Sequence, residues 1–467
     1  MRDTIAAIAS GMTASGIGII RISGPEAFRL PAELFRAGKK VENPDLEKHP
    51  NLSVYEWKAN TIHYGHLYDG DACIDECLIM AMRAPHTFTG EDTIEINCHG
   101  GLFVMQRILS LVLRHNVRSA EPGEFTKRAF LNGRIDLTEA EAVMDVISSQ
   151  SDDALESSVS QLGGSLKNEI TALRSVIMDE LAFIEAALDD PEHMSLDGYA
   201  NELKKKIQPV KQRLSSLISS FQNGKILREG VMTVILGKPN AGKSSLLNVL
   251  TGEDRAIVTD IAGTTRDVLE ENVTLGGIKL RLLDTAGIRE TSDRIEEIGV
   301  ERAVKYAGQA DLILCVIDSS RPLDENDEKI LQIMKGKQAV VLLNKSDLHT
   351  YVSENDIKRR TDAAVLSFSA KERTGMDELA ETIRGMFFGG DVSFNEQVIL
   401  TNVRHKEAAE RAMHSIKLVE DSIDMDMPED FYTIDLMEAY RLLGEIIGES
   451  VEEDLVNTIF AKFCMGK

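Results

Sequence analysis

A glycine-rich segment preceded by an apolar run constrains this chain more than any other feature. It reads Gly-Lys-Pro-Asn-Ala-Gly-Lys-Ser over residues 237–244, which matches the G-x-x-x-x-G-K-S pattern of phosphate-binding loops. Residues 231–236 before it are apolar and rich in β-branched side chains, which predicts a buried strand, and residues 245–250 have helical character. Backbone N–H groups and a helix N-terminus then face the same phosphate. These flanks favour a nucleotide-binding loop over a chance glycine turn.

Individual side chains of this loop have expected roles. Lys243 should reach the β- and γ-phosphates, and the Ser244 hydroxyl should ligate Mg²⁺. Asn240 offers a side-chain carbonyl that could hold a monovalent cation and offset charge in the transition state. The expected nucleotide contacts of the loop are Asn240, Ala241, Gly242, Lys243, Ser244 and Ser245.

Three further motifs follow in the order that guanine-nucleotide enzymes need. They are Asp284-Thr285-Ala286-Gly287 after the predicted strand 278–283, Asn344-Lys345-Ser346-Asp347 after strand 339–343, and Ser369-Ala370-Lys371 after strand 364–368. Asp284 would hold Mg²⁺ through water, and the Gly287 amide would sense the γ-phosphate. The Asp347 carboxylate can accept from N1–H and the 2-amino group of guanine, donors that adenine lacks, so it favours GTP over ATP. Motifs at successive strand ends predict a doubly wound P-loop GTPase domain over residues 229–389.

Two features distinguish this predicted GTPase from many small ones. Ile288 directly follows Gly287, where many small GTPases carry a glutamine that orients the attacking water. Some other group must do so, and Glu290 is the nearest candidate. Thr265 lies where it can ligate Mg²⁺ and the γ-phosphate when its loop closes.

Charge and length bound the remaining possibilities. The 467 residues carry 52 Lys and Arg against 76 Asp and Glu, a formal net charge of −24. This acidic surface repels nucleic acid in general, so RNA contact would need a local basic patch or a helper protein. A chain of this length corresponds to about three domains.

Cysteine usage and hydropathy bear on the compartment. The five cysteines are scattered, and Cys73 with Cys77 lacks the second pair that would complete a zinc site. Unpaired thiols suit the cytosol. No signal-peptide pattern is recognisable, and no run approaches the ~20 apolar residues of a membrane span. We therefore expect a cytoplasmic protein with no membrane partner.

The pattern outside residues 229–389 divides into an α+β part and a helical part. Residues 1–131 contain predicted strands at 17–22, 61–68, 75–82 and 93–98, and a helix at 102–115. Helical patterns fill 132–228, including 151–189 and 196–221, and 390–467, including 395–424 and 432–463. We expect one helical domain into which the GTPase domain is inserted, although two separate helical domains would fit the same pattern. Arg21 and Glu95 lie on predicted strands, at an edge or an exposed face.

Motifs along the whole chain carry a resemblance to a known family. They are residues 237–245, 260–267 and 284–290, together with 19–25, 88–96, 98–101, 122–133 and the ending Phe-Cys-Met-Gly-Lys at 463–467. The sequence resembles the MnmE family, also called TrmE, of tRNA wobble-uridine modification GTPases. The GTPase motifs alone are shared with ribosome-assembly GTPases, so the outer motifs make the match specific.

The resemblance implies partners and cofactors that spacing alone does not. The N-terminal domain would bind a reduced folate, 5-formyl- or 5,10-methylene-tetrahydrofolate, and mediate homodimerisation. With the flavoprotein MnmG, also called GidA, the family installs an aminomethyl- or carboxymethylaminomethyl-type group on C5 of the uridine at tRNA position 34. Paired GTPase domains hydrolyse GTP in a K⁺-stimulated reaction that also needs Mg²⁺.

Site residues carry over by motif. The resemblance implies K⁺ ligands at Asn240, Thr259, Ile261 and Thr264, Mg²⁺ ligands at Ser244 and Thr265, and a water-positioning role for Glu290. It implies GTP contacts at Thr259, Asp260, Ile261, Ala262, Gly263, Thr264, Thr265, Asp284, Thr285, Ala286, Gly287, Asn344, Lys345, Asp347, Ser369, Ala370 and Lys371. Folate contacts would fall on Arg21, Glu95, Arg134 and Lys467. The chain departs from the family in having Arg134 where lysine is common and Met465 where isoleucine or leucine is common.

Cys464 has two open interpretations. Val456, Ile459, Phe460 and Phe463 recur at helical spacing, which predicts a docked tail that carries Cys464 to a fixed place. A thiolate there could be a nucleophile if cationic neighbours lowered its pKa, or the thiol could be a packing residue. For the whole chain, a GTPase of tRNA modification competes with a GTP-driven RNA or ribosome-assembly switch that modifies nothing.

Overall fold

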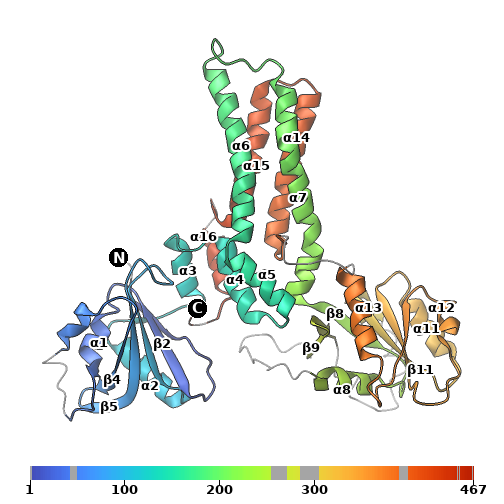
Figure 1. Ribbon diagram of the computed structural model, residues 1–467, viewed down its shortest axis with the longest axis horizontal. Helices are drawn as coiled ribbons and strands as arrows, with labels where there is room; N and C mark the ends of the chain where they lie inside the picture. Colours follow the sequence, from blue (N-terminus) through green and yellow to red (C-terminus); the bar gives the residue numbers. More distant parts are fainter. Residues whose placement is uncertain are drawn as a thin grey trace. The chain divides into compact units, whose positions relative to one another are not determined.

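The chain forms two compact units, Met1–Met144 with Leu443–Lys467, and Asp145–Leu442. The computed structural model describes residues 3–42, 50–253, 271–283, 304–388, 398–449, 451, 453–464 and 466. Figure 1 shows the elements of each unit along the chain.

The first unit is built on a seven-stranded sheet with strand order β3-β4-β5-β6-β2-β1-β7. Its strands are β1 (Ile5–Ile8), β2 (Ile17–Ser23), β3 (Phe35–Ala37), β4 (Thr61–Asp69), β5 (Ala72–Met82), β6 (Thr93–His99) and β7 (Arg118–Ser119). Neighbouring strands are antiparallel except the β1–β7 pair. The four strands predicted from the sequence are confirmed, whereas the short strands β1, β3 and β7 were missed.

Helix α2 (Leu102–Arg114) covers one face of this sheet, as the apolar period predicted. Its buried residues Met105, Ile108 and Leu111 pack in one core with strand residues such as Ile20 and Ile94. The side chains of β2 and β6 that alternate with these core residues lie on the opposite face. Arg21 and Glu95, which are opposite each other in the β2–β6 register, therefore belong to a sheet face rather than to an edge.

The end of the chain packs into the first unit. This unit also contains α1 (Arg29–Leu34), η1 (Leu52–Glu56), α3 (Glu124–Leu131), most of α4 (Leu137–Ser148) and α16 (Glu453–Phe460). Val456, Phe460 and Phe463 are buried in one cluster with Ala129 of α3 and Leu137 of α4. Gly123 permits this approach, because a Cβ there would lie 2.5 Å from the Phe460 carbonyl oxygen. The predicted docking of the tail is confirmed.

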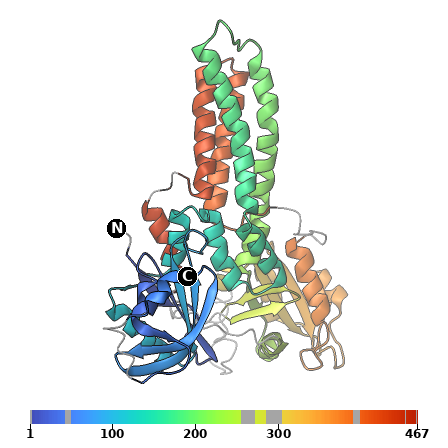
Figure 2. The ribbon, with the colours of Figure 1, turned by 60° about the vertical axis from the view of Figure 1, so that its left-hand side comes forward.

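The second unit contains long helices that run side by side in Figures 1 and 2. They are α6 (Ser165–Asp189), α7 (Tyr199–Glu229), α14 (Val403–Asp424) and most of α15 (Glu429–Ile447), with the shorter α5 (Asp152–Leu162) before them. Gly163 and Gly164 separate α5 from α6, whereas α7 continues through Pro209 as one helix.

Two predicted helical spans were too long. Residues 398–402 are not helical, because α14 begins after Asn402, whose side chain accepts from Arg404 N at 3.0 Å and caps the helix. The span 432–463 is interrupted at Gly448, which has a φ of +89° and follows the end of α15.

A second sheet, with strand order β13-β12-β11-β8-β10-β9, is formed by residues that lie between α7 and α14 in the chain. Its strands are β8 (Val231–Leu236), β9 (Glu271–Leu275), β10 (Ile278–Leu282), β11 (Leu312–Asp318), β12 (Ala339–Asn344) and β13 (Ala364–Ser367). All neighbours are parallel except β9 and β10. The carboxyl ends of β8, β11, β12 and β13 therefore meet at one edge, where ligands bind in sheets of this kind.

Helices and apolar cores cover both faces of this sheet. The helices are α8 (Lys243–Glu253), α11 (Glu325–Ile333), α12 (Glu354–Lys358) and α13 (Met376–Phe388). One core joins Ile235 and Leu314 to Leu246 of α8 and Leu379 of α13. The other joins strand residues of opposite parity, such as Val234 and Ile313, to Leu331 of α11 and Ile357 of α12.

Two helical glycines give opposite expectations for stability. Replacing Gly385 of α13 by alanine should stabilise the protein by up to about 1 kcal/mol, because the helix gains propensity and nothing lies within 4 Å of the new Cβ. Replacing Gly224 of α7 should destabilise it, because the new Cβ would lie 2.2 Å from the Leu400 carbonyl oxygen. Thermal melts followed by circular dichroism would compare the two variants. A rise in melting temperature for Gly224→Ala would contradict the packing described here.

Candidate functional site

The phosphate-binding loop, residues 237–244, makes its turn with backbone conformations that few side chains tolerate. Gly237 and Gly242 have φ values of +153° and +106°, and Asn240 has φ +64°. A Cβ on Gly237 would lie 2.4 Å from the Val316 carbonyl oxygen, and one on Gly242 would lie 2.0 Å from Nδ2 of Asn344. Both glycines are therefore required, Gly237 by a close backbone carbonyl and Gly242 by the Asn344 side chain, and the absence of side chains is also what cradling a phosphate needs.

Lys243 begins α8 and folds back across the loop. Its Nζ donates to the carbonyl oxygens of Gly237 and Lys238, each at 2.8 Å. Burial lowers the pKa of the ammonium. The lysine thus lies directly over the turn at the helix N-terminus, where phosphate oxygens would compete with these carbonyls for its protons.

Asn344, at the carboxyl end of β12, joins the phosphate-binding loop to the neighbouring strand-end loop. Its Nδ2 donates to the Ala241 carbonyl at 2.8 Å, and its Oδ1 accepts from the Ala370 amide at 3.0 Å. The side chain is 3% exposed. One buried amide therefore fixes the separation between the predicted phosphate site and the predicted base site.

Neighbouring side chains orient the carboxylate of Asp347. The Ser369 hydroxyl donates to its Oδ1 at 2.7 Å, and Lys371 Nζ lies 3.8 Å from its Oδ2. The hydrogen bond from Ser369 lowers the pKa of the Asp347 carboxyl below its ordinary value. The carboxylate is therefore ionised at neutral pH, as reading two donors on a guanine edge requires.

Asp318, at the carboxyl end of β11, orients the loop after β12 and was missed in the sequence. Lys345, which has φ +65°, donates through Nζ to Asp318 Oδ2 at 2.6 Å. Burial opposes the ionisation of Asp318, but hydrogen bonds from Lys345 and Ser320 outweigh it and lower its pKa to about 2. The sequence did contain a signal for Asp318. It ends an apolar run that forms a strand, and the nucleotide-binding motifs also follow such strands.

A second candidate site lies on the face of the N-terminal sheet that α2 does not cover. Arg21 Nε is 2.7 Å from Glu95 Oε1, and the two side chains are 18% and 13% exposed. The guanidinium lies 5.9 Å and 5.7 Å from the ring centroids of Phe88 and Phe125, two neighbours that sequence reasoning did not single out. A cation with one carboxylate partner between aromatic rings is a setting for a flat, anionic ligand.

The tail reaches this candidate site. Arg21 Nη1 donates to the Gly466 carbonyl at 3.2 Å, and Gly123 N donates to the Cys464 carbonyl at 3.3 Å. The side chain of Cys464 is half-buried. Arg134 lies exposed in the turn after α3. The structure thus brings Arg21, Glu95 and the backbone beside Cys464 into one region.

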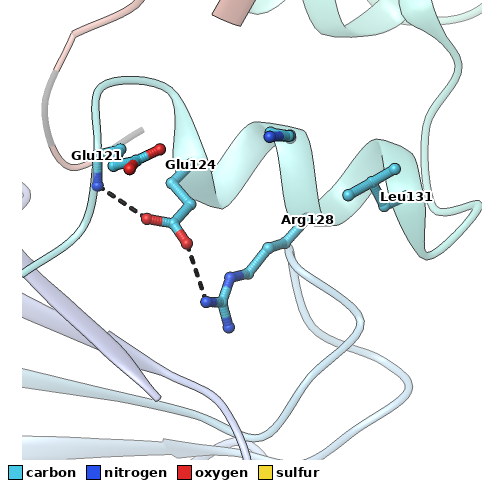
Figure 3. A pocket seen from close by; sticks show the side chains of 5 residues that line it. Glu121, Glu124, Arg128 and Leu131 are labelled. Atoms are coloured by element: carbon cyan, nitrogen blue, oxygen red, sulfur yellow. Dashed lines mark hydrogen bonds and ion pairs between the residues drawn. The ribbon is translucent and has the colours of Figure 1, made fainter. Parts of the chain in front are cut away.

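A pocket of about 200 Å³ lies along α3, and two of its charged side chains, Glu124 and Arg128, are paired with each other. It is lined by Glu121, Glu124, Lys127, Arg128 and Leu131. Figure 3 shows the Glu124 carboxylate between the Glu121 amide and the Arg128 guanidinium. Arg118 also donates to Glu124 at 2.6 Å. This ion-pair network fixes α3, and we assign no ligand to the pocket.

Several predicted residues lie outside the described ranges. They are Thr259, Asp260, Ile261, Ala262, Gly263, Thr264, Thr265, Asp284, Thr285, Ala286, Gly287, Glu290 and Lys467. Their roles, and those of the other site residues, stay predictions.

Comparison with known proteins decides the family. A profile described as the MnmE helical domain matches residues 137–464, and one described as the GTP-binding protein TrmE N-terminus matches residues 4–134. The chain belongs to the MnmE family of tRNA modification GTPases. The first of these matches spans more than half of the chain, so MnmE membership rests on sequence outside the phosphate-binding loop as well as within it.

Full-length relatives agree with the family profiles. A tRNA modification GTPase MnmE of Lachnoclostridium phytofermentans is 52% identical over 100% of this chain and 99% of its own length. The MnmE protein of Acetivibrio thermocellus is 46% identical over 100% and 99%. The resemblance and the enzyme class predicted from the sequence, a GTPase, are thereby confirmed.

The solved G domain of the T. maritima FeoB iron transporter matches 33% of this chain and 96% of its own, at 28% identity and a TM-score of 0.25.

In the part of the chain that the structure describes, none of the helices has the length and apolar character needed to cross a bilayer.

Proposed function

We propose that this chain is the GTP-hydrolysing component of tRNA wobble-uridine modification. The proposal rests chiefly on one observation. The whole chain aligns with proteins named tRNA modification GTPase MnmE, at 52% and 46% identity. The buried Asn344 side chain supports the proposal, because it joins Ala241 of the phosphate-binding loop to Ala370 of residues 369–371, the predicted base loop. In this proposal residues 1–131 bind folate and dimerise. Residues 132–228 and 390–467 form the helical domain, and 229–389 the inserted doubly wound GTPase domain.

Nucleotide selection in this proposal rests on the base loop. Asp347 accepts from guanine, while Ser369 orients its carboxylate. Lys345, Ala370 and Lys371 complete the base site, and Asp318 holds Lys345. An adenine in the same place would leave the Asp347 carboxylate without its two donors, which disfavours ATP.

Phosphate binding in this proposal rests on the loop and its flanks. Lys243 neutralises the β- and γ-phosphates, and backbone N–H groups of residues 240–245 face them. Ser244 with Thr265 would hold Mg²⁺, and Asn240 with Thr259, Ile261 and Thr264 would hold K⁺; bound cations offset negative charge that develops in the transition state. Glu290 would position the attacking water. Thr259–Thr265 and Asp284–Gly287 would supply the remaining nucleotide contacts.

The modification chemistry is assigned to the N-terminal unit. Arg21, Arg134 and Lys467 would bind the anionic glutamate tail of a reduced folate, and Glu95 would accept from the pterin. The aromatic rings beside Arg21 and its partial exposure fit such a ligand. We further propose a cytoplasmic homodimer that works with the flavoprotein MnmG on tRNA.

Potassium should stimulate GTP hydrolysis and sodium should not. Asn240 lies at the turn of the loop in a left-handed conformation, and its side chain would supply a cation ligand. Turnover in KCl should exceed that in NaCl of matched ionic strength by on the order of ten-fold or more. Asn240→Gly is the matched variant, because glycine adopts φ +64° without strain and removes the side-chain amide with its carbonyl. It should retain nucleotide binding and lose the preference; equal turnover of the unmodified protein in both salts would reject the assignment.

Cys464→Ser should separate the two activities. We expect wobble-uridine modification to be lost and GTP hydrolysis to stay nearly intact, because Cys464 lies in the first unit and the GTPase motifs lie in the second. A host strain lacking its own family member would carry either form on a plasmid, and its tRNA nucleosides would be measured by mass spectrometry.

Cys73→Ser, a change of a second half-buried thiol in the first unit, is the control and should restore modification. Normal modification with Cys464→Ser, or equal loss of both activities, would defeat the assignment of Cys464. Unchanged wobble nucleosides in the strain without any copy would instead sink the proposed function and favour an RNA or ribosome-assembly switch.

A further inference from the structure

Lys238, the second residue of the phosphate-binding loop, connects that loop to the start of α11. Its Nζ lies 2.8 Å from Asp324 Oδ2 and 2.6 Å from Asp327 Oδ2. The Lys238 and Asp327 side chains are 11% and 4% exposed, whereas that of Asp324 is 56% exposed. At this depth the Lys238–Asp327 pair is shielded from the solvent screening that weakens surface ion pairs.

The two carboxylates that hold Lys238 are themselves fixed. Asp324 is the N-cap of α11, and its side chain accepts from the amides of Asn326 at 2.9 Å and Asp327 at 3.3 Å. Asp327 accepts in return from the Asp324 amide at 3.1 Å. This capping box sets both carboxylates on a rigid helix end. Lys238 is therefore anchored to a fixed point rather than to mobile surface groups.

The loop is held on both sides of its left-handed turn. Asn344 holds the loop at Ala241, and Lys238 holds it three residues earlier. Between them lie Pro239 and the left-handed Asn240. The backbone carbonyl of Lys238 is also one of the two acceptors of Lys243 Nζ. A shift of Lys238 would therefore move both the Asn240 turn and a backbone acceptor of Lys243.

We propose that Lys238 is a positioning residue that sets how long a guanine nucleotide stays bound, by pinning the phosphate-binding loop to α11. The proposal rests on the guanine-nucleotide binding proposed above. Lys238 does not touch the nucleotide in this account. Its ion pair keeps the loop amides in the orientation that phosphate requires, so less ordering remains to be done when the ligand binds.

The test is the dissociation rate of GDP that carries a fluorescent methylanthraniloyl label, measured by stopped flow with an excess of unlabelled GDP. Lys238→Met keeps the length and apolar stem of the side chain but removes the ammonium, and should speed release about ten-fold. Lys238→Arg keeps a cation beside Asp327 and should stay within about two-fold of the unmodified protein. Lys329→Met makes the same chemical change at an exposed position of α11 and should leave the rate unchanged.

A paired variant separates positioning from mere stability. Lys238→Met leaves the buried Asp327 carboxylate without its cation, which could weaken the whole second sheet. Lys238→Met combined with Asp327→Asn removes that uncompensated charge, and should regain the thermal stability while release stays fast. Recovery of slow release in the double variant would show that only stability is involved and would overturn the proposal.

Unchanged release with Lys238→Met in a folded protein would also overturn it. Failure of the unmodified protein to bind labelled GDP at all would instead contradict the proposed function, so the two failures are distinguishable.

Discussion

The site at the edge of the second sheet depends on one buried amide. Asn344 donates to the Ala241 carbonyl and accepts from the Ala370 amide, so a single side chain spans the phosphate-binding loop and the base loop. Backbone groups buried at a sheet edge must be paired, and each unpaired one would cost about 1 to 3 kcal/mol. Because Asn344 pairs one group from each loop, the two loops cannot separate without leaving both unpaired.

Other contacts extend this constraint across the strand ends. Phe368 N donates to the Leu343 carbonyl, and Ser346 N donates to the Phe368 carbonyl, which ties the chain after β12 to the chain after β13. Asp318, the last residue of β11, fixes Lys345. Parallel order places all these strand ends at one edge. The predicted base site is thus built on hydrogen bonds between strand-end residues of the protein itself.

The sequence predicted those elements whose structure is set by residues close to them in the chain. The strand ends, the glycine turn and the amphipathic helix 102–115 follow from periodicity and from glycine conformation alone. Arg21 and Glu95 could not be resolved between an edge and a face, because the choice depends on register with β6, a non-local pairing. The motif assigned no role to Lys238, because its partners lie at the start of α11, 86 and 89 residues further along.

Short or interrupted elements also escaped prediction. β1 has only four residues, two of them alanine, and gains its place by pairing with β2 and β7. The helical pattern of 432–463 hid the break at Gly448, where a Cβ would lie 2.8 Å from Cβ of Leu137. For β1, tertiary contacts outweigh local propensity, whereas at Gly448 the left-handed conformation of a glycine ends the helix.

The central claim is that Asn344 couples the phosphate half of the site to the base half. Its most direct test is the affinity of Asn344→Ala for GDP, ADP and inorganic tripolyphosphate, measured by competition with fluorescently labelled GDP. Coupling predicts that GDP affinity falls by roughly ten- to hundred-fold, that the GDP-over-ADP preference shrinks, and that tripolyphosphate, which has no base, is also weakened. Tripolyphosphate binding that stays unchanged while the base preference collapses, or GDP affinity equal to that of the unmodified protein, would contradict the claim.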